Sequence, residues 1–293
     1  MTPDNNENKS LTPFGIDEKY TNYDESKFHI INVPYAKTVS YIKGAEKGPE
    51  AIIKASEQVE LYDIATESEP YLKGISFEEI NTNQELTSIW EEMSQKVHKC
   101  ITDNKFPIIL GGEHSITHGG IMGCKQKHND LCVLHIDAHC DLREDYLGDK
   151  YSHACALRYA FDGNIPIVQV GIRSAEKEEH LLIKNNPSKI KTFFASKKKL
   201  NNKKILNSLQ SKNLYITIDI DGFDPSVIPH TGTPEPGGLG WYEVINLLED
   251  IFANFNVIAT DIVELAPSDF STISDFTVAK LLYKVLALKA LTK

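Results

Sequence analysis

Seven short runs rich in apolar residues recur along the chain and alternate with longer segments of helical periodicity. Several runs are almost continuously apolar, which is typical of parallel strands buried on both faces. Their alternation with helices predicts a three-layer α/β/α fold around a central, mainly parallel, doubly wound sheet. The expected strands are 28–33, 107–110, 131–136, 166–172, 191–195, 214–220 and 256–262.

The segments between these runs predict six helices. The segment 49–61 begins with Pro49, and proline is favoured in the first turn of a helix. No internal repeat or low-complexity linker divides the chain, so we expect a single domain over 26–293 after a polar N-terminal arm over 1–25. The expected helices are 49–61, 85–100, 176–185, 203–210, 242–252 and 274–291.

The composition restricts the possible partners and the compartment. The chain has 293 residues and a formal net charge of -10 without a basic face, which argues against a nucleic-acid partner. No stretch approaches the roughly 20 apolar residues of a membrane span, and the polar start lacks the apolar core of a secretory signal. The five cysteines show neither a CxxC pair nor a disulfide-like framework, so we expect a reduced, cytoplasmic setting.

Three clusters of acidic residues and histidines follow three of the expected strands directly. They read Gly-Gly-Glu-His-Ser at 111–115, Asp-Ala-His-Cys-Asp at 137–141 and Asp-Ile-Asp-Gly-Phe-Asp-Pro at 219–225. In open α/β sheets ligands bind outside the carboxyl ends of the strands, so the clusters are expected to meet at one edge. Together they offer six metal donors, from His114, Asp137, His139, Asp141, Asp219 and Asp221.

The spacing of these donors favours a metal site over a set of ordinary turn residues. Any single cluster could be acidic residues at the end of a strand, where aspartate is common. However, five of the six donors lie at a period of two, and alternate residues of an extended chain face the same side. So many carboxylates in one cleft would repel one another, and bound cations would relieve that repulsion.

The donor chemistry predicts which metal is bound and what it does. Four carboxylates and two histidines favour two Mn²⁺ ions over zinc, which prefers sulfur and nitrogen ligands. Two adjacent cations that share a water lower its pKa towards roughly 7, so the predicted site is suited to hydrolysis at neutral pH.

Several polar residues near the clusters are expected to have structural roles. His118 lies one turn after His114 and is interpreted as structural. His135 has the same parity as Asp137, so it can face the site or a helix, and we interpret it as a core residue. Cys140 and Cys155 are expected to pack in the interior rather than bind metal. Glu113 is expected to support the ligands or to pair with backbone groups.

From about Val33 to the C-terminus, the chain resembles the ureohydrolases, the arginase and agmatinase superfamily, and most resembles the agmatinases within it. The resemblance implies an arginase- and deacetylase-like fold and the hydrolysis of a small cationic guanidino compound, agmatine, to putrescine and urea. It also implies a homo-oligomer, either a trimer or a hexamer. The segments that carry it are 44–52, 111–117, 137–143, 151–158, 171–174, 219–239 and 261–267.

The resemblance also implies individual roles. His153 matches the family's proton-shuttling histidine, and Glu264 matches the carboxylate that pairs with the guanidinium. These roles suit the residue types, because a carboxylate grips a guanidinium bidentately and a histidine can protonate a leaving amine. One Mn²⁺ would be held by His114, Asp137, Asp141 and Asp219, and the other by His139, Asp137, Asp219 and Asp221. Asp141 would also accept a hydrogen bond from the bridging hydroxide.

The subfamily and the substrate tail leave alternatives open. Arginases carry Asn where this chain has Arg143, and a Ser-Gly-Asn segment where it has 148–152, which speaks against arginine as the substrate. The segments 151–152 and 232–238 look like those of agmatinases. Guanidinobutyrate, guanidinopropionate, formimidoylglutamate, guanidine and arginine remain alternative substrates. A non-catalytic homologue and a one-metal deacetylase relative are the remaining hypotheses.

Overall fold

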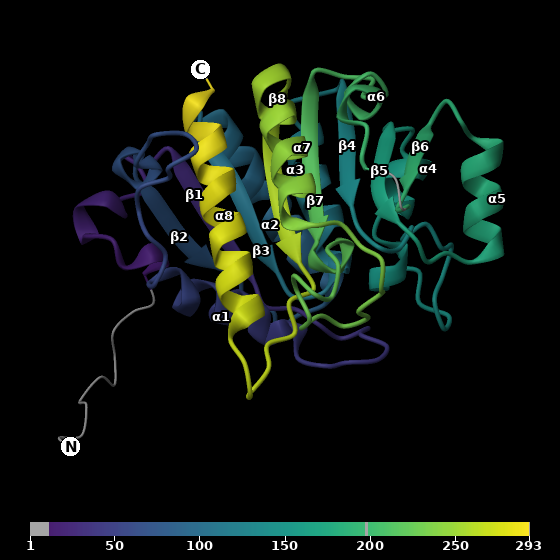
Figure 1. The fold of residues 1–293 in the computed structure, drawn as a ribbon, viewed down its shortest axis with the longest axis horizontal. Coiled ribbons are helices and arrows are strands. Elements are labelled where there is room, and N and C mark those ends of the chain that lie inside the picture. Colours follow the sequence, from purple (N-terminus) through teal and green to yellow (C-terminus); the bar gives the residue numbers. More distant parts are fainter. Residues whose placement is uncertain (1–11, 197–198, 293) are drawn as a thin grey trace.

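All eight strands of the central sheet run parallel, in the order β2-β1-β3-β8-β7-β4-β5-β6 (Figure 1). The computed structural model describes residues 12–196 and 199–292. The parallel sheet expected from the sequence is confirmed, and helices on both of its faces complete the expected three-layer α/β/α fold. The strands are β1 (Phe28–Val33), β2 (Ile75–Glu79), β3 (Phe106–Gly111), β4 (Leu131–Ile136), β5 (Ile167–Ile172), β6 (Ile190–Phe194), β7 (Asn213–Asp219) and β8 (Asn256–Val263).

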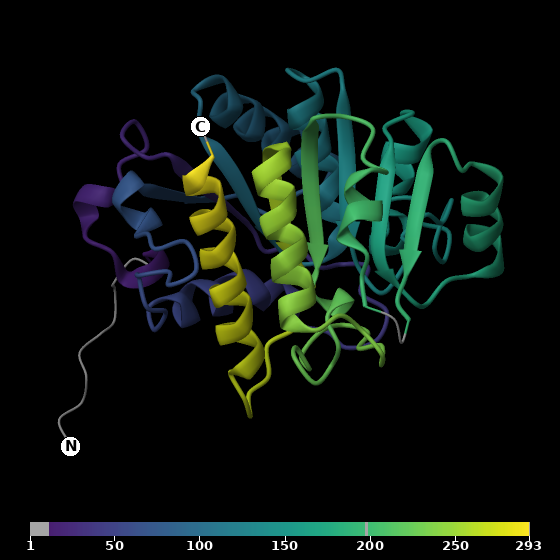
Figure 2. The same cartoon turned by 45° about the horizontal axis from the view of Figure 1, so that its top comes forward.

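Helices cover both faces of the sheet and form one apolar core on each side (Figures 1 and 2). On one face lie α1 (Gly48–Ser56), α6 (Asn202–Leu206), α7 (Trp241–Asn254) and α8 (Ile273–Leu291). On the other face lie α2 (Leu86–Thr102), α3 (Thr117–Lys125), α4 (Arg158–Asp162) and α5 (Lys177–Asn185). Short 3-10 helices are η1 (Pro13–Gly15), η2 (Glu18–Tyr20), η3 (Ala45–Lys47), η4 (Pro70–Lys73), η5 (His114–Ile116), η6 (His153–Cys155) and η7 (Ile220–Gly222).

The seven expected strands and six expected helices all form, with ends shifted by a few residues, but the edge strand β2 and the helix α3 were not predicted. Three glycines weaken the helical signal of α3, because glycine has a low helix propensity. The glycines are needed for packing: a Cβ on Gly120 would lie 2.1 Å from the Tyr215 hydroxyl, and one on Gly123 would lie 2.6 Å from Val97 Cβ. Close tertiary packing therefore overrides the local preference. The short helix α4 was also not predicted.

The N-terminal segment contacts the core as far as the structure describes it. Residues 1–11 of the expected arm lie outside the described residues. Phe14 is buried, its ring centroid lies 4.8 Å from that of Tyr283 in α8, and its N–H donates to Ser56 Oγ at 2.8 Å. The division into an arm over 1–25 and a domain over 26–293 stays a prediction.

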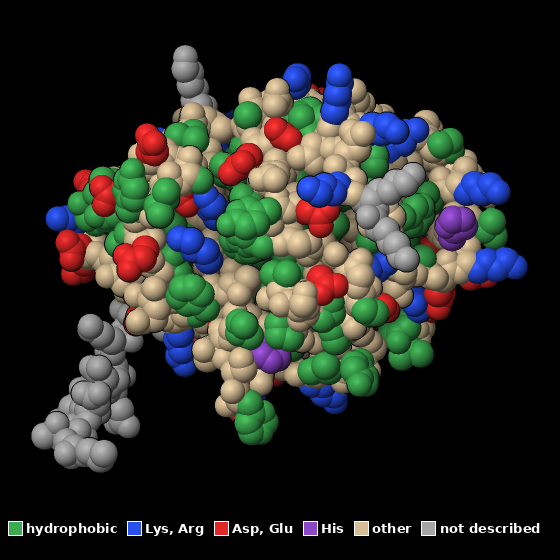
Figure 3. Space-filling model, viewed as in Figure 1, with side chains coloured by type: hydrophobic (Ala, Val, Ile, Leu, Met, Phe, Trp, Pro, Cys, Tyr) green, Lys and Arg blue, Asp and Glu red, His purple; other side chains and the backbone are tan. Residues whose placement is uncertain are grey.

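Parallel pairing brings the carboxyl ends of all strands to the same edge of the sheet, and the loops that follow them gather there (Figures 1 and 2). The loops after β3, β4 and β7 carry the three clusters found in the sequence. On the face that carries α7 and α8, basic and acidic side chains are interspersed (Figure 3). Among the described residues, no helix is both long and apolar enough to cross a membrane.

Candidate metal centre

The first group of donors surrounds His114, which begins η5 in the loop after β3. Its Nδ1 atom lies 2.9 Å from Asp141 Oδ2, 3.2 Å from Asp137 Oδ2 and 3.5 Å from Asp219 Oδ2. All four side chains are buried. The structure thus brings together residues from the ends of β3, β4 and β7 that are far apart in the sequence.

The second group surrounds His139 and shares Asp137 with the first. His139 Nδ1 lies 2.9 Å from Asp221 Oδ2 and 3.6 Å from Asp137 Oδ1. Asp137 therefore turns one carboxylate oxygen towards each histidine. This is the arrangement expected of a carboxylate that bridges two cations, and all six predicted donors lie within the two groups.

The donors converge through tight turns, and the expected extended chain is wrong for part of the path. Asp141 has a left-handed backbone with φ of 51°, and η7 begins immediately after Asp219. Asp221 N donates to Asp219 Oδ1 at 2.9 Å, so the side chain of one donor sets the position of the next. The left-handed backbone at Asp141 is a local strain that the surrounding contacts must maintain.

Two contacts hold the strained Asp141 in place. Its carbonyl accepts a hydrogen bond from Leu157 N at 2.9 Å. The next residue, Leu142, donates its N–H to the buried Glu179 Oε1 at 2.9 Å. Glu179 on α5 thus holds the backbone next to Asp141, and nothing in the three sequence clusters identified it.

The donors have the chemistry needed to bind a divalent cation. His114 Nε2 forms a 2.7 Å hydrogen bond with Thr217 Oγ1 on β7. Its buried Nδ1 faces the carboxylates and has no hydrogen-bond partner among residues 12–196 and 199–292. A neutral histidine that donates through Nε2 presents a lone pair on Nδ1, which is the form that binds metals. A cation on this side of the ring would satisfy both the lone pair and the carboxylates.

The charge of the centre supports the same conclusion. Burial and the neighbours Asp221 and Asp137 raise the pKa of Asp219, and burial and Asp137 raise the pKa of Asp221. Burial would lower the pKa of His139, but Asp137 and Asp221 raise it to about 12. Both effects show an excess of negative charge that no lysine or arginine neutralises among the described residues. Bound cations would remove that excess.

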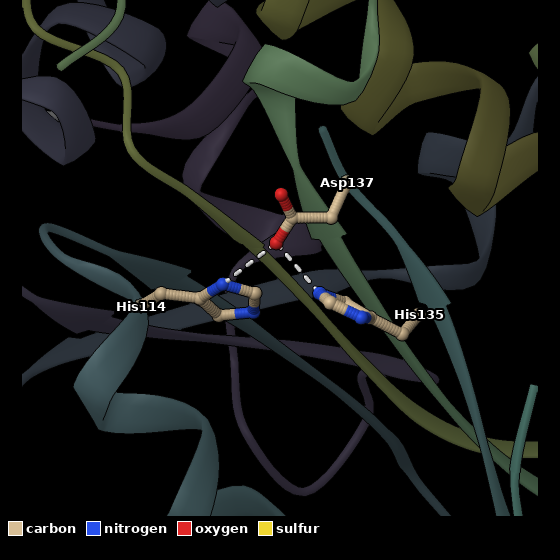
Figure 4. A group of neighbouring side chains, drawn as sticks. All are labelled: His114, His135 and Asp137. Carbon is tan, nitrogen blue, oxygen red and sulfur yellow. Dashed lines mark hydrogen bonds and ion pairs between the residues drawn. The ribbon is translucent and has the colours of Figure 1, made fainter. Parts of the chain in front are cut away.

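His135 has a role that the sequence interpretation missed. It is buried as expected, but its Nε2 lies 2.6 Å from Asp137 Oδ2, and Figure 4 shows that oxygen between the His114 and His135 rings. Gln169 Nε2 lies 3.1 Å from His135 Nδ1 and donates to the Cys140 carbonyl at 2.7 Å. With Nδ1 accepting from Gln169, His135 donates through Nε2, so it orients Asp137 rather than binding metal itself. Its parity with Asp137 was the available signal.

The other residues near the clusters lie as expected. The His118 ring stacks between Trp90 and Tyr159, with centroid distances of 4.0 Å and 3.6 Å, and burial lowers its pKa to about 4. Cys140 and Cys155 are buried free thiols. None of these side chains is grouped with the donors.

A cavity of about 260 Å³ opens above the donors and contains the two other predicted site residues. His153 at the start of η6 and Glu264 after β8 both line it. Glu264 has φ of 70°, and its Oε1 accepts the His114 N–H at 2.6 Å. The predicted site residues that line the cavity are His139, Asp141, His153, Asp219, Asp221 and Glu264.

A model of the arginase family matches residues 26–288. The chain belongs to the arginase family. It is 36% identical over 281 residues to an N(1)-aminopropylagmatine ureohydrolase from Synechocystis, covering 92% of this chain and 91% of that protein. It is 33% identical to an agmatinase from Halalkalibacterium halodurans, covering 85% of this chain and 86% of that protein.

Solved structures give the same assignment. The agmatine ureohydrolase of Thermoplasma volcanium is 31% identical, with a TM-score of 0.84 and 92% of each chain covered. A putative agmatinase from Clostridium difficile is 32% identical, with a TM-score of 0.83, covering 92% of this chain and 99% of that one. The chain is an agmatinase-like hydrolase of the metal-dependent arginase family, and it acts on carbon–nitrogen bonds of guanidino compounds.

Proposed function

We propose that this protein hydrolyses agmatine to putrescine and urea. The observation that carries the proposal is Glu264, a buried carboxylate in the cavity beside the metal donors. Burial and the nearby Glu113 raise the pKa of Glu264 to about 8. No lysine or arginine forms an ion pair with it in the described part of the chain. A guanidinium cation would supply the missing charge.

The surroundings of Glu264 leave one of its oxygens free for this purpose. Oε1 is held by the His114 N–H, while a Cβ on Gly232 would lie 3.4 Å from Oε2. Glycine at position 232 therefore keeps Oε2 approachable. A carboxylate fixed in this way would orient the planar guanidinium, with its carbon directed towards the donors of the metal centre.

The remaining residues divide the chemistry between them. His114, His139, Asp137, Asp141, Asp219 and Asp221 would hold the cations. A pair of bound divalent cations supplies a nucleophilic hydroxide at neutral pH by lowering the pKa of water. His153 lines the same cavity and would protonate the amine that leaves as the carbon–nitrogen bond breaks.

Charged residues in the lining of the cavity support a substrate with a cationic tail. Glu176 and Glu179 line the cavity together with Arg143. Arg143 Nη1 lies 3.0 Å from Glu176 Oε1, and its Nε lies 4.0 Å from Glu179 Oε2. Two carboxylates against one guanidinium leave one negative charge, which favours an ammonium group over the carboxylate of guanidinobutyrate or arginine.

N(1)-aminopropylagmatine is the second candidate substrate. Three relatives that bear this name are 36%, 33% and 32% identical, each covering more than nine-tenths of this chain and of the relative. Its longer tail carries one more ammonium than agmatine, and Glu235, beside His139 at 3.8 Å, is a further carboxylate near the site. The products would be urea and the corresponding triamine.

Three further properties belong to the proposal. We expect two Mn²⁺ ions per subunit, because carboxylates and histidines form the donor set. We also expect a homo-oligomer, a trimer or hexamer, and a cytoplasmic location. Light scattering of the purified protein would test the oligomeric state.

The test of the proposed function is a urea-release panel with the Mn²⁺-loaded protein. The substrates are agmatine, N(1)-aminopropylagmatine, guanidinobutyrate, arginine and guanidine. Agmatine should give the highest kcat/KM. A higher value for N(1)-aminopropylagmatine would transfer the assignment to the second candidate, and a higher value for guanidinobutyrate would refute the cationic tail. Metal binding by the wild-type protein without urea release from any of these compounds would favour the non-catalytic hypothesis.

A further inference from the structure

One hydroxyl group, that of Thr38, connects the buried Glu113 to His153. Thr38 Oγ1 donates to Glu113 Oε1 at 2.9 Å and lies 3.0 Å from His153 Nδ1. It also accepts the His153 backbone N–H at 3.0 Å. The three residues follow β1, β3 and β4, so this hydroxyl joins loops from three strands at the rim of the cavity.

The hydrogen-bond directions follow from the groups involved. A carboxylate only accepts, so the single proton of the Thr38 hydroxyl points to Glu113. Thr38 Oγ1 then meets His153 Nδ1 as an acceptor, which places the proton of that contact on Nδ1. Ser152 Oγ lies farther from the same nitrogen, at 3.3 Å, and can accept from it as well. One donation and two acceptances use the full capacity of a hydroxyl oxygen.

Glu113 is well placed to fix the orientation of Thr38. It is fully buried, and its Oε2 accepts the Thr38 backbone N–H at 2.6 Å while its Oε1 accepts from Ser115 Oγ at 2.6 Å. The backbone N–H of Glu113 donates to the Tyr35 carbonyl at 2.8 Å, which ties the loop after β1 to the loop after β3. Thr38 is thus held at both its backbone and its side chain.

We propose that Thr38 and Glu113 are positioning residues that keep neutral His153 in its Nδ1–H form. This inference rests on the proposed function of His153 as the proton donor. Nε2 is then the only ring atom that exchanges a proton. It takes the proton lost by the attacking water and delivers it to the nitrogen of the leaving amine as the carbon–nitrogen bond breaks. No proton is gained or lost over the cycle.

The kinetic test compares Thr38→Val with Thr38→Ser in the Mn²⁺-loaded protein. Valine removes the hydroxyl at nearly constant shape, whereas serine keeps it. We expect Thr38→Val to lower kcat about 10- to 100-fold, a part of the contribution of general acid catalysis, with KM within about twofold of wild type. Thr38→Ser should restore kcat to within about threefold of wild type. Thr82→Val is the matched control, because Thr82 donates only to the Pro34 carbonyl at 3.1 Å, and kcat should be unchanged.

A second measurement observes the tautomer directly. In the full-length protein labelled with ¹⁵N-histidine, the His153 ring signals are assigned by their loss in His153→Asn. Wild type and Thr38→Ser should show Nδ1–H, and Thr38→Val should lose this preference.

The outcomes separate this inference from the proposed function. Unchanged kcat in Thr38→Val, an equal loss in Thr38→Ser, or a wild-type His153 protonated on Nε2 alone would each overturn the positioning role while the hydrolase assignment stood. Wild-type protein that releases urea from none of the guanidino compounds would instead refute the proposed function, even with the Nδ1–H tautomer observed.

Discussion

Glu78, near the edge of the sheet, and Glu264, at the carboxyl ends of the central strands, are carboxylates whose pKa values shift in opposite directions. The hydrogen bond from His29 lowers the pKa of Glu78 to about 2 against the effect of burial, and Lys96 adds to it. Burial raises the pKa of Glu264 to about 8, and the neighbouring Glu113 adds to the rise. The difference lies in what surrounds each group.

Carboxylates such as Glu78 form ion pairs with lysines of the same chain. Glu78 lies 2.5 Å from Lys96 Nζ, and the buried Asp63 lies 3.0 Å from Lys284 Nζ. The predicted site residues include five buried carboxylates, and the only possible cations among these residues are histidines. The carboxylates are Asp137, Asp141, Asp219, Asp221 and Glu264. The balanced groups therefore stabilise the fold as they stand, whereas we propose that metal ions and a cationic substrate from outside balance the carboxylates of the metal centre.

The largest expected effect comes from Asp137→Asn, which removes the carboxylate shared by both donor groups. We expect kcat/KM for urea release to fall by roughly three orders of magnitude or more, beyond the 10- to 100-fold typical of residues around the ligands. The increase in melting temperature on adding Mn²⁺ should also disappear, because a ligand stabilises only the state that binds it. Urea release and thermal melting with and without Mn²⁺ measure the two effects.

The matched control is Asp63→Asn in the balanced group. It should cost about 3 kcal/mol of unfolding free energy, because it leaves Lys284 buried without its partner. The Mn²⁺-dependent increase in melting temperature should persist. If Asp63→Asn lost that increase while Asp137→Asn kept it, the distinction between the two regions would be wrong.

An intermediate effect is expected for His135→Phe, which removes the 2.6 Å hydrogen bond to Asp137 Oδ2 but leaves every proposed ligand. Mn²⁺ affinity should fall about 10- to 100-fold. Titration of the metal-free protein with Mn²⁺ measures this, with His118→Phe as the control, because His118 lies in an aromatic stack away from the donors. Equal affinities for wild type and His135→Phe would leave His135 without a role in the centre.

The smallest effect is expected for Glu78→Gln. The folded pKa of about 2 lies below the ordinary value of 4.5, so the ionised carboxylate stabilises the fold above pH 4.5. This stabilisation is lost as the pH falls through about 2. Because Glu78 is partly exposed, we expect the variant to lose about 1 kcal/mol at pH 7, with unchanged urea release. Denaturant unfolding at pH 7 and pH 3 should show a smaller difference at the lower pH, and a constant difference would refute the pairing.

The sequence predicts most of the fold because strand burial is a local property. Each expected parallel strand is a short apolar run, so periodicity and length were sufficient. The edge strand β2 was not predicted because only its first two residues are buried, so it lacks a continuous apolar run. The helix α3 was not predicted because its glycines lower the helical signal. These glycines are required by close contacts with α2 and Tyr215, which lie elsewhere in the sequence.

The structure brings together the residues that the sequence placed in clusters, whereas isolated residues beside them were not identified. His114, Asp137 and Asp221 follow strands in recognisable groups, and the structure brings them together. Thr38 and Glu179 carry no sequence signal. Thr38 contacts His153, and Glu179 accepts from the Leu142 N–H, and in both pairs the two residues are far apart in the sequence. Residues that position other residues depend on tertiary geometry, so sequence spacing alone could not identify them.

We propose that two divalent cations bind between His114 after β3 and the histidine and carboxylate donors at the carboxyl ends of β4 and β7. Crystals of the Mn²⁺-loaded protein, measured on both sides of the manganese absorption edge, test it directly. We expect two anomalous peaks per subunit, with Asp137 between them, one beside His114 and the other beside His139. A single peak, or two peaks that do not share Asp137, would contradict it.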